Sequence, residues 1–126
     1  MNNIQAVKDI YAAFLRGDIP YILAQMADDV IWEFEGPPEV PYTGIMRGPE
    51  QASFFFRGLM TVENPGLVMN EFVAMDDKVV ALGRFFGTVK RTGKSLNVPV
   101  AHYWVFRDGK VAHYRNFAPV PADAYR

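Results

Sequence analysis

His102 is the residue of this sequence whose type and position best suit chemistry near neutral pH. It stands in a β-branched and aromatic run, 96–106, that is typical of a strand. Because residues two apart share one face of a strand, His102 lies with Val100, Trp104 and Phe106. An imidazole among aromatic rings can donate a hydrogen bond to a ligand oxygen or exchange a proton. The alternative is a core histidine whose hydrogen bonds are satisfied by neighbours.

The strand that follows decides which side chains face His102. The two strands flank Asp108-Gly109, which is the strongest short-range hairpin signal. A plain two-residue turn would place His102 opposite Arg115. A bulged turn, with the glycine in the left-handed conformation, would place His102 opposite Tyr114 and put Asn116 on the same face. The residues alone leave both registers open.

Aromatic side chains from other parts of the chain complete the candidate site. Trp32 lies in an alternating run, 30–35, that predicts a half-buried strand. Tyr42 lies in a loop rich in proline and glycine, 36–44, where it could close the mouth of a pocket. A plain core position for Trp32 and a surface position for Tyr42 are the alternatives. The expected ligand-binding residues are Trp32, Phe34, Tyr42, Phe55, Trp104, Tyr114 and Asn116.

The composition excludes several classes of function. The chain has 126 residues, a net charge of −1 and no cysteine, which suits one domain and argues against nucleic acid binding and thiolate chemistry. The N-terminus lacks a secretory pattern, and no run approaches the length of a membrane span. We therefore expect a cytoplasmic protein. We expect no cofactor and no metal, because the two histidines fall on opposite faces or beside no carboxylate.

Three helices are predicted in the first half of the chain. Ile4, Val7, Tyr11 and Phe14 form one apolar stripe, with Asn2 or Asn3 as its cap and Gly17 at its end. Asp18 caps a short second helix that buries Ile19, Ile22, Leu23 and Met26. A third helix starts at 48–50, buries Ala52, Phe55, Phe56, Leu59 and Met60, and stops at 64–66.

Strands dominate the second half. Besides 30–35, strands are predicted over 67–75, 78–91, 96–106 and 111–118. Strands in succession after helices predict an α+β domain with an antiparallel-rich sheet. Interior glycines in 78–91 indicate a strongly curved sheet. Closed by helices, such a sheet forms a cone with an apolar interior, and residues 1–126 form a single domain.

The chain resembles the nuclear transport factor 2-like superfamily, and within it the SnoaL-like and ketosteroid isomerase-related branch. The resemblance rests on the order of elements and on the segments 17–19, 27–30, 41–44, 47–48 and 106–111. It implies a cone-shaped α+β fold, a deep apolar cavity and a homodimer. It also implies the bulged register of the last hairpin, with Tyr114 and Asn116 in the cavity. It implies no single reaction, because members isomerise, cyclise, hydrolyse, dehydrate or only bind.

The acid–base positions of these relatives are not kept. The carboxylate base of the steroid isomerases falls on Phe34, and their tyrosine donor falls on Ile10, one residue before Tyr11. Their protonated aspartic acid falls on His102. The polyketide cyclases use an acid near the end of the chain, where this sequence has no carboxylate before Asp123. Steroid isomerisation by that mechanism is therefore not expected.

The sequence thus leads to two hypotheses about function. In the first, the protein binds a small apolar oxygenated molecule and converts it, with His102 as acid–base or oxyanion donor. In the second, the same fold is a non-catalytic module that binds a small ligand or a partner protein. The poverty of ionisable groups in the expected pocket favours binding without turnover.

Overall fold

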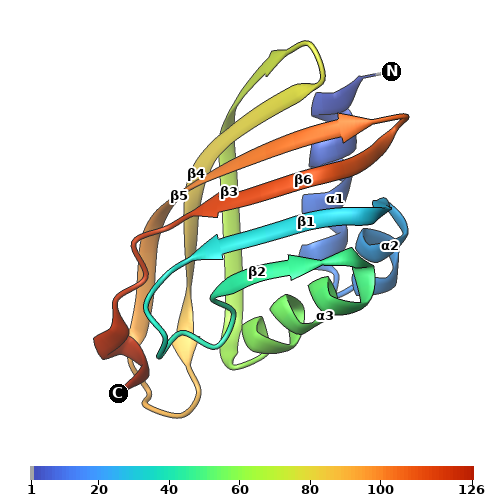
Figure 1. Ribbon diagram of the computed structural model, residues 1–126. Coiled ribbons are helices and arrows are strands. Elements are labelled where there is room, and N and C mark those ends of the chain that lie inside the picture. The colour runs from blue at the N-terminus through green and yellow to red at the C-terminus, as the bar shows by residue number, and fades with distance from the viewer. Residues whose placement is uncertain (1) are drawn as a thin grey trace.

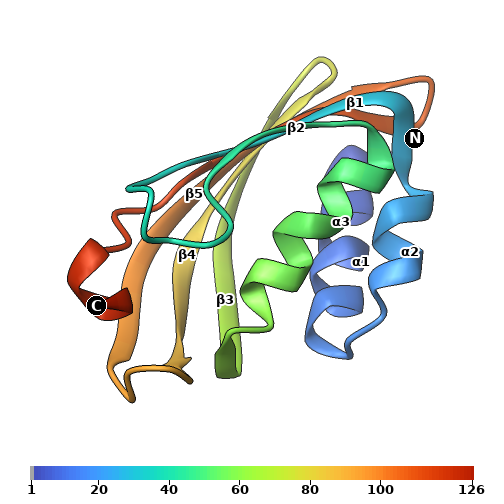
Figure 2. The same ribbon diagram turned by 60° about the horizontal axis from the view of Figure 1, so that its bottom comes forward.

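A computed structural model describes residues 2–126 as a curved six-stranded sheet packed on three helices (Figure 1). The helices are α1 (Asn3–Leu15), α2 (Ile19–Ala24) and α3 (Gly48–Leu59). The strands are β1 (Met26–Glu35), β2 (Gly44–Arg47), β3 (Val62–Met75), β4 (Lys78–Val89), β5 (Ser95–Arg107) and β6 (Lys110–Phe117). A 3-10 turn, η1 (Ala122–Tyr125), follows. Figure 2 shows the sheet arching over the helices, and the predicted α+β cone is confirmed.

The strand order places the first strand, β1, beside the last strand, β6, in the middle of the sheet. The order is β2-β1-β6-β5-β4-β3. The pair of β1 and β6 is parallel, and every other neighbouring pair is antiparallel. The first long strand and the last hairpin are therefore neighbours, although about eighty residues separate them in sequence.

Side-chain caps define the starts of the first two helices as the sequence predicts. The Asn2 side chain accepts a hydrogen bond from the backbone N–H of Gln5, and Asp18 accepts one from Tyr21. Such caps satisfy donors that have no partner inside the helix. Gly17 ends the first helix region with a φ of 76°, a conformation that favours glycine.

Several predicted boundaries are wrong. β1 begins at Met26, within the segment expected to close the second helix, and β2 was not predicted. The third helix ends at Leu59 rather than at 64–66, which belongs to β3. A register shift between Glu63 and Gly66 accommodates this proline-containing stretch within the strand, as bulges do. Met60 lies past the helix end and is exposed.

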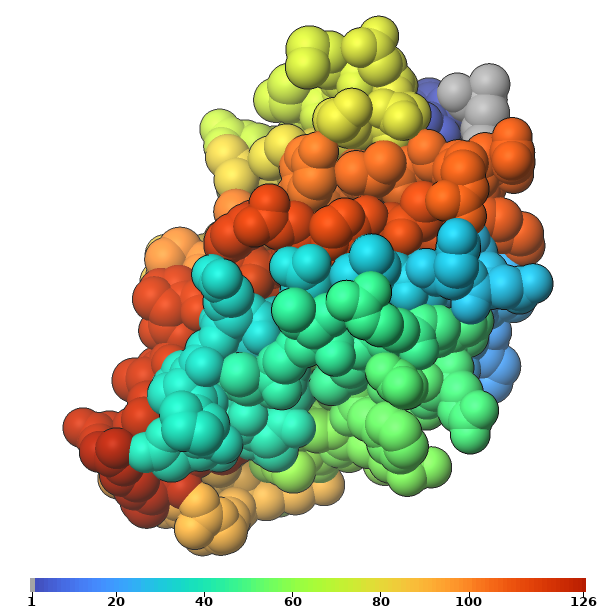
Figure 3. All heavy atoms as spheres, in the orientation of Figure 1, coloured from blue at the N-terminus to red at the C-terminus, as the bar shows by residue number. Residues whose placement is uncertain are grey.

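The sheet has a buried inner face and an exposed outer face. Along β5 the even-numbered residues from Leu96 to Phe106 are buried, whereas their odd-numbered neighbours are not. Along β1 the residues Val30, Trp32 and Phe34 are buried in the same way, as predicted. The helices cover the inner face, and Figure 3 shows the outer face. None of the helices in residues 2–126 is long and apolar enough to cross a bilayer.

Candidate functional site

The hairpin of β5 and β6 combines a tight turn with a bulge farther along. Asp108 and Gly109 have φ values of 52° and 77°, as in a two-residue turn with both central residues left-handed. Phe106 pairs with Val111, but Val105 pairs with His113. Ala112 is therefore the extra residue of a β-bulge.

The bulge sets which side chains of β6 face inward. His102 lies opposite Asn116, and Trp104 lies opposite Tyr114. Tyr114 and Asn116 are buried on the inner face, as the bulged register predicts. The predicted pairing of His102 with Tyr114 is wrong by two residues, because the bulge lies at Ala112 and not in the turn.

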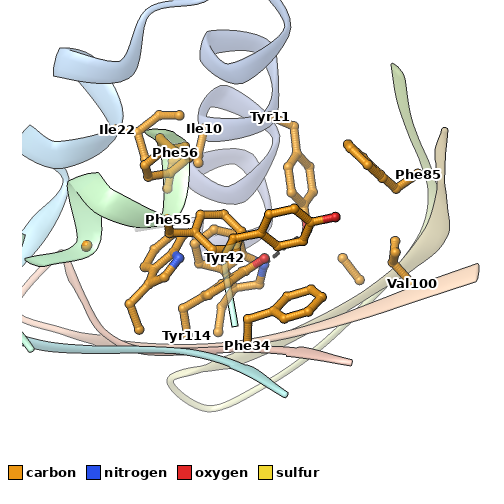
Figure 4. Packing of buried hydrophobic residues seen from close by; sticks show 14 of the residues in the cluster. Ile10, Tyr11, Ile22, Phe34, Tyr42, Phe55, Phe56, Phe85, Val100 and Tyr114 are labelled. Atoms are coloured by element: carbon orange, nitrogen blue, oxygen red, sulfur yellow. Dashed lines mark hydrogen bonds between the residues drawn. The ribbon is translucent and has the colours of Figure 1, made fainter. Parts of the chain in front are cut away.

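A cavity of about 60 Å³ lies between the helices and the inner face of the sheet. It is smaller than the roughly 150 Å³ of an engineered apolar cavity that binds benzene. Its wall includes every side chain expected at the site: Trp32, Phe34, Tyr42, Phe55, His102, Trp104, Tyr114 and Asn116. Figure 4 shows Tyr11 descending from α1 towards Phe34 and Tyr114, which rise from the sheet.

The cavity wall is least covered where two helices end. Phe14 near the end of α1, Leu59 at the end of α3 and Leu67 on β3 all line the cavity. Each of them is only partly buried, whereas most of the wall is fully buried.

Tyr11 joins His102 and Trp104 in a buried hydrogen-bonded chain. The Tyr11 hydroxyl lies 2.8 Å from Nδ1 of His102, and Nε1 of Trp104 donates to the same hydroxyl at 3.1 Å. Because the indole N–H can only donate, the tyrosine oxygen accepts from it. Nδ1 of His102 is the other partner of this hydroxyl, and the tautomer of the imidazole decides which of the two donates. Burial raises the pKa of the Tyr11 hydroxyl above its ordinary value, although the bond from Trp104 lowers it.

The polar groups of the cavity are neutral. Burial lowers the pKa of His102 from 6.5 to about 3, because an imidazolium loses its hydration there. Burial also raises the pKa of Tyr114 well above its ordinary value. The imidazole is therefore uncharged and the phenol protonated at neutral pH.

Two buried polar atoms of the cavity wall have no hydrogen-bond partner within residues 2–126. They are Nε1 of Trp32 and Oδ1 of Asn116. Nδ2 of Asn116 donates to the Tyr114 hydroxyl at 2.8 Å, so only one end of this amide is satisfied. Trp32 stacks on Tyr114 with ring centroids 3.9 Å apart. Buried polar atoms without partners are uncommon and indicate a place where a ligand or water completes the bonding.

The loop before β2 closes one side of the cavity. Tyr42 is buried, and its hydroxyl accepts a hydrogen bond from Tyr125 of η1 at 2.9 Å. Gly58 lets the loop lie on α3, because a Cβ there would stand 2.9 Å from the carbonyl oxygen of Pro41. Tyr42 thus lines the cavity as expected, and it is not a surface residue.

The outer face of the same strands carries a charged cluster. Glu33 lies 3.0 Å from Nε2 of His113 and 3.5 Å from Nε of Arg115. The two histidines fall on opposite faces, as one of the two expected alternatives has it. The parallel pairing of β1 with β6 brings Glu33 to His113, which therefore does lie beside a carboxylate. No group of three or more metal-ligating side chains occurs in residues 2–126.

Comparison with known proteins identifies the family. The model of the SnoaL-like domain matches residues 7–114. The chain belongs to this family. No match was found among the curated proteins.

Solved structures of similar proteins share the fold of this SnoaL-like chain. A nuclear transport factor 2-like protein of unknown function from Burkholderia pseudomallei is 29% identical, with a TM-score of 0.83 over 94% of this chain and 91% of that one. One from Burkholderia thailandensis is 31% identical, with a TM-score of 0.81 over 90% and 88%. TerC, co-crystallised with polyporic acid, is 27% identical, with a TM-score of 0.81 over 92% and 90%.

The SnoaL-like cavity of this chain contains one important residue that sequence reasoning missed. Tyr11 was assigned only to the apolar stripe of the first helix, since the resemblance pointed to Ile10. Both side chains line the cavity. A tyrosine on a stripe of aliphatic and phenylalanine residues was the available signal, because a buried hydroxyl needs a partner. The partner is 91 residues away.

Proposed function

We propose that this SnoaL-like protein binds a small, neutral, largely apolar molecule that carries oxygen. The observation that carries the proposal is the cavity wall, which offers hydrogen-bonding groups and no ionised one among its described residues. An ionised ligand would lose its hydration there without meeting an opposite charge. The expected ligand contacts are Trp32, Phe34, Tyr42, Phe55, Trp104, Tyr114 and Asn116, with His102.

The aromatic lining supports this class of ligand. Ligand pockets are mostly apolar, with a few polar groups that fix orientation. The small cavity of about 60 Å³ limits the ligand to a few heavy atoms unless partly buried side chains of the wall, such as Leu59 and Leu67, move aside.

Binding is better supported than turnover. A general base works best with a pKa near the working pH, and the buried His102 imidazole has a pKa of about 3. Phe34 occupies the position where steroid isomerases have their base. If the ligand is converted, His102 would act as a neutral donor to a developing oxyanion, not as a base.

Filling the cavity provides the main test. Val100 lines the cavity, whereas the adjacent Ala101 faces outward. Val100→Phe should abolish the chemical-shift changes that neutral compounds such as cyclohexanone cause in the wild type, and Ala101→Phe should leave them intact. Equal binding by all three proteins would place the ligand outside the cavity. The ionised compound benzoate should not bind in any case.

A native mass spectrum of the purified protein provides a second test. Molecules carried through purification would appear as added mass and could be weighed after gentle denaturation. A released neutral, oxygen-containing compound would support the proposal and identify the ligand. A released anion would contradict it.

We also propose that the chain forms a homodimer through the outer face of the sheet. Leu82, Phe86 and Phe117 lie there with 38%, 38% and 40% of their surface exposed, and exposed apolar groups favour association. The same native spectrum tests this proposal. A monomer at micromolar concentration would contradict it, and Phe117→Glu should shift a dimer towards monomer.

A further inference from the structure

We propose that His102 and Asn116 hold a hydroxyl group between them, so that the preferred ligands of the cavity are small alcohols or phenols. This inference rests on the proposed function, because it specifies the polar end of the ligand. It follows from the register of the hairpin, the protonation of His102 and the unpartnered oxygen of Asn116.

The register places the two side chains next to each other. His102 and Asn116 are directly opposite residues of β5 and β6, and both line the cavity. Opposite residues of antiparallel strands have Cβ atoms roughly 4.5–5.5 Å apart. Their exposed fractions are only 4% and 8%, so any partner for their polar atoms must come from within the cavity.

The histidine presents a donor. We assign the proton of Tyr11 to Nδ1 of His102, because Nδ1 is the one acceptor that the Tyr11 hydroxyl meets among the described residues. A neutral imidazole has one proton, which must then be on Nε2. Nε2 has no hydrogen-bond partner within the part of the chain that the structure describes. With the other tautomer, the tyrosine proton would be left without an acceptor.

The asparagine presents an acceptor. Its Nδ2 donates to the hydroxyl of Tyr114 at 2.8 Å, and this bond orients the amide. Its Oδ1 is buried and has no partner among the described residues. A donor on one strand therefore stands beside an acceptor on the next.

A hydroxyl group is the smallest ligand group that satisfies both atoms. Its oxygen accepts from Nε2–H of His102, and its proton goes to Oδ1 of Asn116. A carbonyl or ether oxygen would leave Oδ1 unpaired, and a carboxylate would meet a second acceptor. A single polar atom also suits a cavity of about 60 Å³.

The test compares phenol, anisole and toluene by NMR titration of the wild-type protein. The three share an aromatic ring. Phenol can both donate and accept a hydrogen bond, anisole can only accept one, and toluene can do neither. Phenol should bind roughly tenfold more tightly than toluene, since it gains two net hydrogen bonds, and more tightly than anisole, which gains only one. Equal affinity for all three would overturn the proposed pairing of a hydroxyl with His102 and Asn116 and leave the proposed function standing. If none of the three binds and the smaller ethanol does not bind either, the proposed function fails as well.

Asn116→Leu distinguishes hydrogen bonding by Oδ1 of Asn116 from a mere match of ligand size to the cavity. Leucine has the branching of asparagine without its polar atoms, so toluene should still bind while the preference for phenol disappears. Asn97→Leu changes an exposed asparagine of β5 and should keep the preference. A preference for phenol that survives in Asn116→Leu would overturn the role of Oδ1.

The state of His102 can be read without any substitution. Imidazole ¹⁵N chemical shifts distinguish the two neutral tautomers, and His113 is the only other histidine. His102 should carry its proton on Nε2 in the wild type. In Tyr11→Phe, which lacks the hydroxyl, His102 should become a mixture of the two neutral tautomers. A wild-type His102 protonated on Nδ1 would overturn the proposal even if phenol binds.

Discussion

The two histidines of this chain occupy opposite faces of one hairpin and have opposite surroundings. His102 lies on the inner face with a tyrosine hydroxyl at 2.8 Å, and burial lowers its pKa to about 3. His113 lies on the outer face beside the carboxylate of Glu33, with about a third of its side chain exposed. The same residue type thus serves as a neutral hydrogen-bonding group in one place and as a partner of a charge in the other.

The comparison shows that neutral polar side chains lie on the inner face of the sheet and charged side chains on its outer face. Side chains one residue apart on a strand point to opposite faces, so Tyr114 and Asn116 join the cavity while Arg115 joins Glu33 outside. The inner face is buried and the outer face is partly exposed. A substitution should therefore have very different effects on the two faces.

Placing a charge at each histidine position should give the largest difference in stability between the two faces. His102→Lys buries an ammonium group without a counter-ion and should cost at least about 3 kcal/mol of the free energy of unfolding. His113→Lys places a positive charge near Glu33 at a partly exposed position and should change the free energy of unfolding by about 0.5 kcal/mol or less. Urea unfolding measures both. Equal losses of unfolding free energy would show that a charge at position 102 is solvated as well as one at position 113.

Removing a phenylalanine from each face should give the next largest difference. Phe34→Ala should cost about 3 kcal/mol and enlarge the cavity, because the surroundings relax only partly. Phe117→Ala, at a residue with 40% exposure, should cost about 1 kcal/mol or less. If Phe34→Ala also gains affinity for toluene, the enlarged space is continuous with the ligand cavity. No gain would mean that the wall collapses.

The pH dependence of stability should sharpen the comparison further. Between pH 6.5 and about 3 the unfolded chain protonates His102 and the folded protein does not. The free energy of unfolding should therefore fall as the pH drops through this window, by up to about 1.4 kcal/mol per pH unit from this group.

His102→Gln should remove that part of the slope, and His113→Gln should leave it in place. Comparing each variant with the wild type cancels the contribution of the carboxylates, which titrate in the same range. An unchanged slope in His102→Gln would mean that the inner imidazole can be protonated in the folded protein.

The smallest effect is expected from the outer cluster. Glu33→Gln removes the carboxylate that lies near His113 and Arg115, all of which are partly exposed. Partly exposed ion pairs contribute little, so the loss should be about 1 kcal/mol or less and should shrink in high salt. A larger loss that does not depend on salt would show that this cluster is structural rather than solvated.

Local patterns in the sequence were enough for the three helices, for every strand except β2, and for the inner faces of β1 and β5. Alternation placed Trp32, Phe34, His102 and Trp104 inside, because the side-chain period of a strand is two. Asn2 and Asp18 marked helix starts through caps that involve only a few neighbouring residues. These features depend on short-range geometry, which the order of residues specifies directly.

The site itself was decided by tertiary structure. Ala112 could be recognised as a bulge only once β6 was paired on both sides, and this bulge puts Asn116 opposite His102. Tyr11 reaches His102 across 91 residues, and Glu33 reaches His113 across 80. Sequence spacing carries no information about such distances. Therefore the sequence determined which groups were available, and the packing of the helices on the sheet determined which of them meet.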